Sequence, residues 1–195
     1  MKTKKGRARR FTAKAVILTL LMAILCGLTL DLLLTEIEKK AYPREYLEEI
    51  TLASEEFGVP EYIILSVIKT ESNFEKTAVS SAPAYGLMQL TEETYFWIGN
   101  DMLRENPSAF DIYDPKTNIR YGTYYLSFLY RKYGSWDTAF AAYNAGPGNV
   151  NEWLTDSEIS DGNGNLVNIP FKETRNYVKK VNAAIEKYEK LYYTK

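Results

Sequence analysis

Residues 62–72 read YIILSVIKTES, and this stretch decides both the fold and the chemistry of the chain. Ile64, Val67 and Ile68 follow the i, i+3, i+4 spacing of one helical face, and Glu71 continues that stripe at i+7. The pattern predicts a helix that carries a carboxylate on its apolar face. Burial disfavours the charged form of a carboxyl group, and the negative end of the helix dipole acts in the same direction. Glu71 is therefore a candidate general acid near pH 7.

The amino-acid composition narrows the available chemistry. The chain has 195 residues, enough for one domain and an additional segment, and contains no histidine. Ser-His-Asp and Cys-His catalysis and the usual zinc sites are therefore excluded, and proton transfer must fall to Asp, Glu, Lys or Tyr. Cys26 is the only cysteine, so no intrachain disulfide can form. We expect no metal and no cofactor, because the sequence holds no motif for either.

The charge is distributed unevenly along the chain. Residues 1–14 hold seven basic and no acidic side chains, although the formal net charge of the whole chain is only −1. Residues 15–195 therefore hold the other 17 of the 24 basic side chains against 25 acidic ones, a net charge of −8. Such an acidic body binds nucleic acid poorly, so we expect no nucleic-acid partner.

The N-terminal region predicts one transmembrane helix. The uncharged run from Ala15 to Leu30 is broken by Asp31 and resumed by three leucines, so a helix over residues 15–34 has the roughly 20 residues that cross a bilayer. The basic residues 1–14 before it predict a cytoplasmic N-terminus and a body on the extracytoplasmic side.

Three interpretations of this apolar segment compete. A cleaved signal peptide requires small residues at its cleavage site, and the sequence around residues 32–36 offers no convincing ones. A lipoprotein would use Cys26, but Leu25 is a poor residue before a lipidated cysteine, and apolar sequence continues past it. We therefore favour an uncleaved signal anchor, with Asp31 near the outer interface where it can reach water.

The rest of the sequence predicts a linker over residues 35–44 and a mostly α domain over residues 45–195. Thr91 and Asp114 are residue types that cap helix N-termini, and Pro115 suits the first helical position. The expected helices cover residues 45–57, 61–72, 115–133, 136–144 and 171–193, and a turn-rich stretch predicts a small hairpin between residues 158 and 169.

Four short blocks stand out within this domain. They are ES at residues 71–72, SSAPAYGLMQ at 80–89, AYNAG at 142–146 and ETRNYV at 173–178. In this order and spacing they resemble the catalytic domain of the soluble lytic transglycosylase family, which is related to goose-type lysozyme. The resemblance covers about residues 50–185. It implies a lysozyme-like helical domain, here preceded by the predicted transmembrane helix.

The resemblance also implies a role for individual residues. Glu71 matches the single catalytic acid of the family. Ser80 matches a serine that hydrogen-bonds near the catalytic carboxyl and the N-acetyl group of the sugar. Tyr143 matches a tyrosine that points its hydroxyl into the cleft beside Glu71, and Glu173 matches a supporting carboxylate at the border of the cleft. The predicted substrate-binding set is Ser80, Gly86, Met88, Gln89, Tyr143, Asn144, Glu173 and Tyr177.

Residue chemistry is consistent with several of these roles. Glycine at position 86 allows the backbone to approach a glycan closely, and Gln89 offers both a donor and an acceptor. Glu173 and Tyr177 are four residues apart, so they are neighbours on one helix face. One position departs from the family pattern, which usually has glycine where this chain has Pro83. Proline fixes φ near −65° and removes a backbone donor, so we expect the loop that carries Ser80 to run differently.

The resemblance implies cleavage of the β-1,4 bond between N-acetylmuramic acid and N-acetylglucosamine in peptidoglycan, without water, to give 1,6-anhydro ends. In this mechanism Glu71 acts first as acid and then as base. Two alternatives remain open, namely a goose-type lysozyme-like hydrolase, in which Glu173 or Asp114 would hold a water, and a non-catalytic peptidoglycan-binding scaffold. The implied partners are peptidoglycan strands, the membrane through residues 15–34, and cell-wall or secretion machinery. The implied location is the cell membrane, with the catalytic domain outside.

Overall fold

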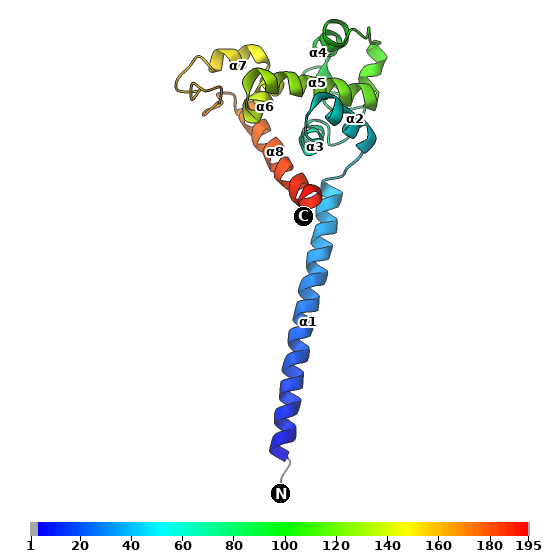
Figure 1. Ribbon diagram of the computed structural model, residues 1–195, viewed down its shortest axis with the longest axis vertical. Coiled ribbons are helices and arrows are strands. Elements are labelled where there is room, and N and C mark those ends of the chain that lie inside the picture. Colours follow the sequence, from blue (N-terminus) through cyan, green and yellow to red (C-terminus); the bar gives the residue numbers. More distant parts are fainter. Residues whose placement is uncertain (1–3, 195) are drawn as a thin grey trace. The chain divides into compact units, whose positions relative to one another are not determined.

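The computed structural model describes the backbone of residues 4–194 and the side chains of residues 13–194 (Figure 1). The chain divides into two units, one ending at Pro43 and the other beginning at Arg44. The predicted basic N-terminus covers residues 1–14, and within it only the side chains of residues 13 and 14 belong to the described part.

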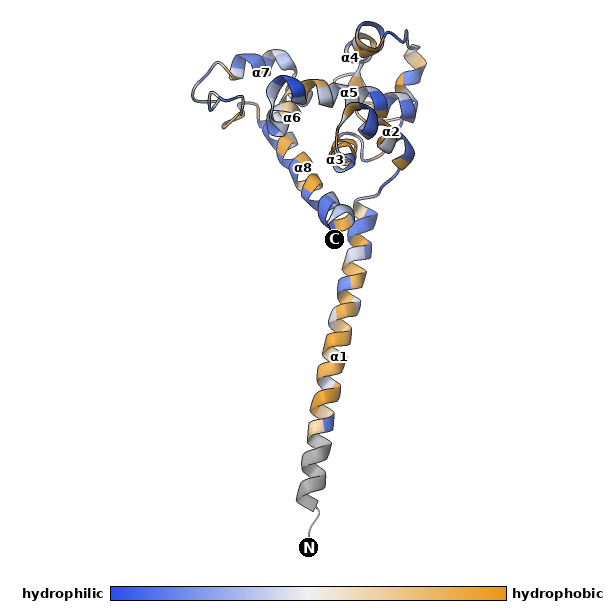
Figure 2. Ribbon diagram, in the orientation of Figure 1, coloured by the Kyte–Doolittle hydropathy of each residue, from blue (hydrophilic) through white to orange (hydrophobic). Residues whose placement is uncertain are grey.

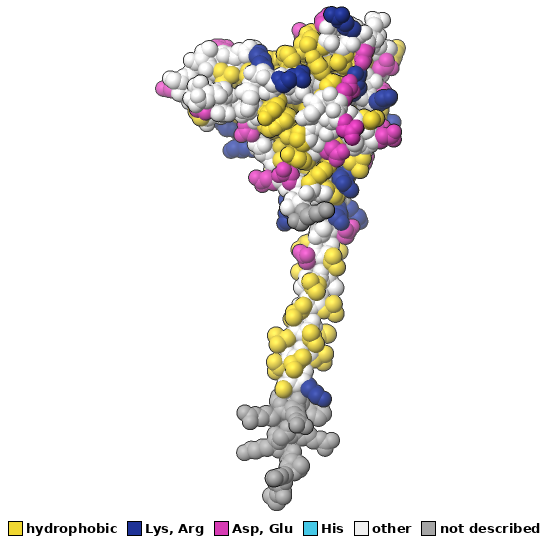
Figure 3. Space-filling view, in the orientation of Figure 1, with side chains coloured by type: hydrophobic (Ala, Val, Ile, Leu, Met, Phe, Trp, Pro, Cys, Tyr) yellow, Lys and Arg dark blue, Asp and Glu magenta, His cyan; other side chains and the backbone are white. Residues whose placement is uncertain are grey.

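The first unit is one long helix, α1 (Lys4–Ala41). Its portion from Ala13 to Ala41 is long and apolar enough to cross a bilayer. Figures 2 and 3 show apolar residues along this portion, and its large apolar side chains are exposed. The helix does not end at Leu34. It continues through residues 35–41, which the sequence had assigned to a linker.

The second unit is mostly helical, as predicted. In chain order its elements are α2 (Leu47–Phe57), α3 (Glu61–Glu71), β1 (Ala84–Tyr85), β2 (Leu90–Thr91), α4 (Glu92–Phe96), the π-helix η1 (Trp97–Leu103), the 3₁₀-helix η2 (Ala109–Tyr113), α5 (Pro115–Tyr133), α6 (Trp136–Ala145), α7 (Pro147–Trp153), α8 (Lys172–Tyr188) and the π-helix η3 (Glu189–Tyr193).

Helix α3 lies at the centre of this unit. Six consecutive residues, from Ile63 to Ile68, are buried, so neighbouring elements cover it on almost all sides rather than on one face. It packs mainly against α8, while α2 packs against α5, and α6 joins α5 and α8. The apolar stripe predicted from the sequence is therefore part of a core that holds the C-terminal end of α3 in place.

The predicted helix boundaries have the expected capping geometry. The side chain of Thr91 accepts a hydrogen bond from the Thr94 amide at 3.2 Å, and Asp114 accepts one from the Thr117 amide at 2.9 Å. Gly134 ends α5 with a φ of 71°, a conformation that glycine adopts without strain. These local signals were correctly read from the sequence.

The strands were less well predicted. β1 and β2 form an antiparallel hairpin in which Ala84 pairs with Thr91 and Tyr85 with Leu90, in a region for which the sequence predicted no strand. The hairpin expected between residues 158 and 169 is reduced to one isolated bridge, between Ser160 and Leu166. Strands this short carry too few residues to show an alternating pattern.

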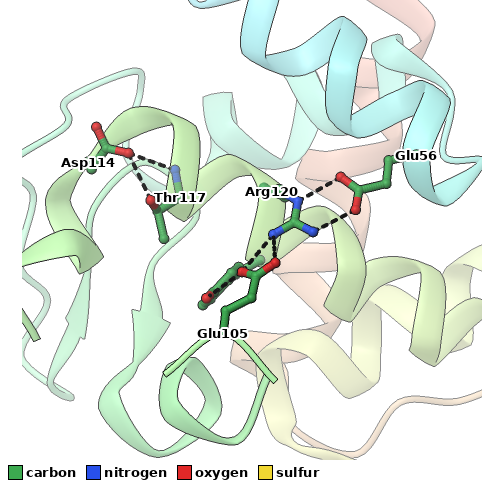
Figure 4. Close-up of polar contacts among 6 residues, drawn as sticks. Glu56, Glu105, Asp114, Thr117 and Arg120 are labelled. Atoms are coloured by element: carbon green, nitrogen blue, oxygen red, sulfur yellow. Dashed lines mark hydrogen bonds and ion pairs between the residues drawn. The ribbon is translucent and has the colours of Figure 1, made fainter. Parts of the chain in front are cut away.

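One charged cluster ties α2 and α5 to the segment after η1 (Figure 4). Arg120 on α5 donates from Nε and Nη2 to the Glu56 carboxylate of α2, at 2.7 and 2.6 Å. Its Nη1 donates to Glu105 at 2.6 Å, and the Tyr121 hydroxyl donates to the same carboxylate at 3.0 Å. The guanidinium also lies 5.7 Å from the centre of the Phe57 ring. Two parallel hydrogen bonds between a guanidinium and a carboxylate fix the orientation of both groups and add to their electrostatic attraction.

We expect Arg120→Met to lower the free energy of unfolding by about 1–2 kcal/mol, because two carboxylates lose their shared cation. Water screens the cluster, since the Glu56 and Glu105 side chains are 40% and 38% exposed, which keeps the effect at this modest level. Thermal unfolding of the full chain in detergent measures it. Arg131→Met, at an exposed arginine on the same helix, is the control. An equal loss of unfolding free energy in both variants would contradict the stabilising role given to the Arg120 cluster.

Candidate active site

Glu71 is the last residue of α3 and is partly buried. The buried Tyr177 of α8, 106 residues further along the chain, donates its hydroxyl hydrogen to Glu71 Oε1 at 2.7 Å. The bond joins the two helices that pack most closely in this unit. The packing of α3 on α8 thus brings together two of the predicted site residues.

The surroundings of Glu71 change its acidity. Burial raises the pKa of its carboxyl from 4.5 to about 7, and the hydrogen bond from Tyr177 acts in the opposite direction by favouring the charged form. Among the described side chains no lysine or arginine forms an ion pair with Glu71. The carboxyl is therefore close to half protonated at neutral pH, as a group that both gives and takes a proton requires.

Tyr143 of α6 lies near this carboxyl but is bonded elsewhere. Its hydroxyl donates to the Met88 carbonyl at 2.7 Å, and its ring lies 5.3 Å from that of Tyr125. Burial, followed by the charge of Glu71, raises the pKa of Tyr143 well above its usual value. The structure therefore puts Tyr143 within electrostatic reach of Glu71, while its hydrogen bond goes to the segment after β1.

That segment is fixed by Asn118, a fully buried residue of α5. Asn118 Nδ2 donates to the carbonyls of Tyr85 and Ile112 at 3.0 and 2.8 Å, and its Oδ1 accepts from the Met88 amide at 2.7 Å. A buried side chain with all three partners satisfied specifies one backbone path. Sequence reasoning missed Asn118, because one polar residue within a helical pattern gives no signal of burial.

Gly86 and Met88 have packing roles in this arrangement. Gly86 is buried with a φ of 76°, and a Cβ there would lie 2.9 Å from the Ile112 carbonyl oxygen and collide with the Asn118 side chain. Met88 is fully buried and lies so close to Gly122 of α5 that a Cβ at 122 would collide with it. The side chain of Met88 is not exposed, so any sugar contact at these two positions would be made by the backbone. The glycine is explained by its close approach to α5.

Gln89 stabilises the segment after β1 through side-chain hydrogen bonds. Its backbone has a φ of 49°, and its Nε2 donates to the carbonyls of Ala78 and Gly86 at 3.1 and 2.8 Å. Ser72 adds a second tie, because its Oγ donates to the Leu87 carbonyl at 2.8 Å. The end of α3 and the segment at 86–89 are thus directly linked.

Ser80 and Glu173 have no hydrogen bond to Glu71. Ser80 is exposed, and its Oγ donates to the Ala82 carbonyl within the loop that contains Pro83. Glu173 is exposed in the first turn of α8, one helical turn before Tyr177. Of the pair predicted on this helix face, only Tyr177 reaches the carboxyl.

A groove of about 610 Å³ lies beside Tyr143, and Glu71 itself is not among the residues that line it. It contains three predicted residues, namely Gln89, Tyr143 and Asn144. Sequence reasoning missed its aromatic wall, in which rings of α5 and η1 contact one another, because the same residues also suit a helical core. The wall consists of Trp97, Tyr125 and Phe128, with ring centres 5.3 to 6.5 Å apart. Among the described residues, no group of three or more His, Cys, Asp or Glu could hold a metal ion.

The helical architecture and the position of Glu71 define a lysozyme-like domain. The family described as Transglycosylase SLT domain matches residues 48–164, which is more than half of the chain. The chain belongs to this family.

Solved structures of lytic transglycosylases share the fold. An inactive mutant of lytic transglycosylase Slt from Pseudomonas aeruginosa is 30% identical over 77% of this chain, with a TM-score of 0.66. The 70-kDa soluble lytic transglycosylase of Escherichia coli is 31% identical over 78%, with a TM-score of 0.70. A complex of the 70-kDa soluble lytic transglycosylase with bulgecin A is 29% identical over 81%, with a TM-score of 0.73. The match covers only 25 to 26% of those longer chains.

The raised pKa of Glu71 predicts a pH-dependent difference between the wild type and Glu71→Gln. The unfolded chain ionises Glu71 near pH 4.5 and the folded chain near 7, so the wild type loses stability relative to the variant as the pH rises through this window. The difference in the free energy of unfolding between wild type and variant reaches at most about 3 kcal/mol. It does not change further once the pH is above this window. Urea unfolding between pH 4 and 8 measures it, with the exposed Glu152→Gln as control. A pH-independent difference would contradict the burial of the charge.

Proposed function

We propose that residues 45–195 form a lytic transglycosylase domain, which cleaves the β-1,4 bond between N-acetylmuramic acid and N-acetylglucosamine in peptidoglycan and leaves 1,6-anhydro ends. One observation carries this proposal. It is the partly buried carboxyl of Glu71, with a pKa of about 7 and a hydrogen bond from Tyr177 at 2.7 Å. Membership of the SLT family and the likeness to lytic transglycosylases support it.

The proposed reaction uses one carboxyl twice. Protonated Glu71 gives its hydrogen to the glycosidic oxygen as the bond to C1 of the muramic acid breaks, and the N-acetyl carbonyl oxygen of the same sugar stabilises the positive charge at C1. Glu71, now ionised, removes the hydrogen of the C6 hydroxyl, and that oxygen bonds to C1. The acid is regenerated and no water is consumed. Most glycosidases divide these tasks between two carboxylates.

The two tyrosines serve different steps in this proposal. Tyr177 donates to Glu71 and so stabilises the carboxylate that exists between the steps. Tyr143 lies near enough for the Glu71 charge to raise its pKa, and its neutral hydroxyl can stabilise charge developing on the sugar. Burial of Glu71 favours the acid and the bond from Tyr177 favours the base, so the two opposing effects keep both forms accessible.

The groove supplies the proposed binding surface for the glycan. Trp97, Tyr125 and Phe128 offer apolar ring surface, while Asn144 and the side-chain oxygen of Gln89 offer polar groups. Pockets that combine aromatic and apolar side chains with polar groups are typical ligand sites. Ser80 and Glu173 remain predicted cleft residues, at exposed positions that a bound strand could reach.

The competing hydrolase requires a second carboxylate that holds a water. Asp114 was one possibility, but its Oδ2 accepts hydrogen bonds from both the amide and the hydroxyl of Thr117, as an N-cap residue does. Glu173 is exposed and has no hydrogen bond to the Glu71 carboxyl. These observations favour the single-carboxyl mechanism.

We also propose that α1 anchors the domain as an uncleaved signal anchor, with the membrane-spanning part over residues 15–34 and the domain on the extracytoplasmic side. Its apolar portion is long enough to span a bilayer, and the preceding residues are basic. Peptidoglycan lies on that side of the membrane. Cell-wall or secretion machinery is the further proposed partner.

The proposal predicts that the full chain in detergent releases fragments with anhydro ends from purified peptidoglycan, as detected by mass spectrometry. We expect Glu71→Gln to lower the rate by about 10²- to 10⁴-fold, the usual contribution of a general acid–base residue. Glu152→Gln, at an exposed carboxylate of α7, is the matched control and should retain full activity.

Fragments with ordinary reducing ends would indicate a hydrolase instead. A wild-type chain that binds peptidoglycan without cleaving it would indicate a scaffold. Undiminished cleavage by Glu71→Gln would remove Glu71 from the active site.

A further inference from the structure

The groove is bordered by two charges of opposite sign. Of the residues that line it, Lys132 and Glu93 alone belong to the Lys, Arg, Asp and Glu types. Lys132 lies in the last turn of α5, and Glu93 lies in the first turn of α4. The remaining lining residues are apolar, aromatic or neutral and polar. A ligand in the groove therefore meets one cation and one anion, on different elements.

Lys132 contacts the ring of the adjacent Tyr133. The ammonium of Lys132 lies 5.1 Å from the centre of the Tyr133 ring, a cation–π distance. The Tyr133 hydroxyl donates to Asn151 Oδ1 at 3.1 Å and to the Pro147 carbonyl at 3.3 Å, and Pro147 itself lines the groove. Among the described side chains no carboxylate forms an ion pair with Lys132. Its charge is thus available at the wall formed by α5 and the turn at 146–147.

The glutamate acts on the same aromatic surface. Burial chiefly raises the pKa of Tyr125 to about 12, and the nearby Tyr133, when ionised, and the carboxylate of Glu93 add to the effect. Glu93 therefore lies within electrostatic reach of the ring wall. It also has no ion-pair partner among the described side chains. An anionic group in the groove is repelled from the α4 side and attracted to the α5 side.

We propose that Lys132 is a specificity-determining residue of the groove, whose ammonium binds a carboxylate carried by the glycan strand and so favours anionic strands over neutral chitooligosaccharides. Glu93 restricts that carboxylate to the α5 wall. The inference rests on the proposed function, because it assigns the groove to a glycan. Two sources supply the carboxylate, namely the free lactyl group of a denuded strand and the peptide stem of a substituted one.

Binding measurements on the Glu71→Gln variant test this inference without turnover. The full chain in detergent is titrated with chitohexaose, with denuded glycan strands and with stem-bearing strands of the same length. Lys132→Met is compared with Arg131→Met, which removes an exposed cation from the adjacent position outside the groove. Glu93→Gln is the reciprocal variant.

We expect Lys132→Met to weaken binding of an anionic strand by about 3- to 10-fold at low salt and to leave chitohexaose binding unchanged. The loss should shrink as salt is added, because salt screens charges at the surface. Glu93→Gln should strengthen anionic binding, and Arg131→Met should change little. A loss confined to denuded strands identifies the lactyl carboxylate, and one confined to stem-bearing strands identifies the stem; either supports the inference.

Other outcomes overturn it. These are no loss in Lys132→Met, an equal loss for chitohexaose, or the same loss in Arg131→Met. They leave the proposed function intact, because the strands still bind. Failure of the Glu71→Gln parent to bind any glycan would instead contradict the assignment of the groove to glycan, and the inference with it.

Discussion

The site depends on one hydrogen bond, from the Tyr177 hydroxyl to the Glu71 carboxylate, made across the packed helices α3 and α8. Burial alone would leave Glu71 a weaker acid, held in its neutral form. The bond offsets part of that effect and stabilises the ionised form, so the two protonation states have similar free energies near pH 7. The packing of α3 against α8 keeps these two side chains together.

Several polar ties outside the site maintain this arrangement. The buried Asn118 fixes the path of the chain between Tyr85 and Met88, and Ser72 links the end of α3 to the Leu87 carbonyl. The Met88 carbonyl in turn accepts from Tyr143. Because each buried polar group in this chain of contacts has a partner, breaking one leaves another unsatisfied. The segment at 86–89, which is predicted to contact sugar, thus also supports the residues that surround the carboxyl.

The sequence was most informative where a signal is local. Glu71 was found from helical periodicity and Tyr177 from its place in a family pattern, and Thr91 and Asp114 from capping chemistry. Contacts between distant segments could not be predicted in this way. The role of Asn118 depends on three partners on other segments, and no spacing rule anticipates them.

The aromatic wall and the surroundings of Gly86 also depend on contacts between distant segments, which the sequence does not predict. Tyr125 and Phe128 follow an ordinary helical pattern, so their exposure to a groove depends on where α4 and α6 pack. Gly86 stays a predicted sugar contact, and the structure adds a constraint that the sequence does not reveal, namely the close approach of Asn118.

The central claim concerns the acidity of one carboxyl, which ¹³C NMR of glutamate-labelled protein measures most directly. The Glu71 resonance is assigned by its loss in Glu71→Gln. We predict that it titrates near pH 7, and at a higher pH in Tyr177→Phe, because the charged form then loses its hydrogen bond. A midpoint near the ordinary value of 4.5 in the wild type would contradict the account, as would a Tyr177→Phe midpoint that is unchanged or lower.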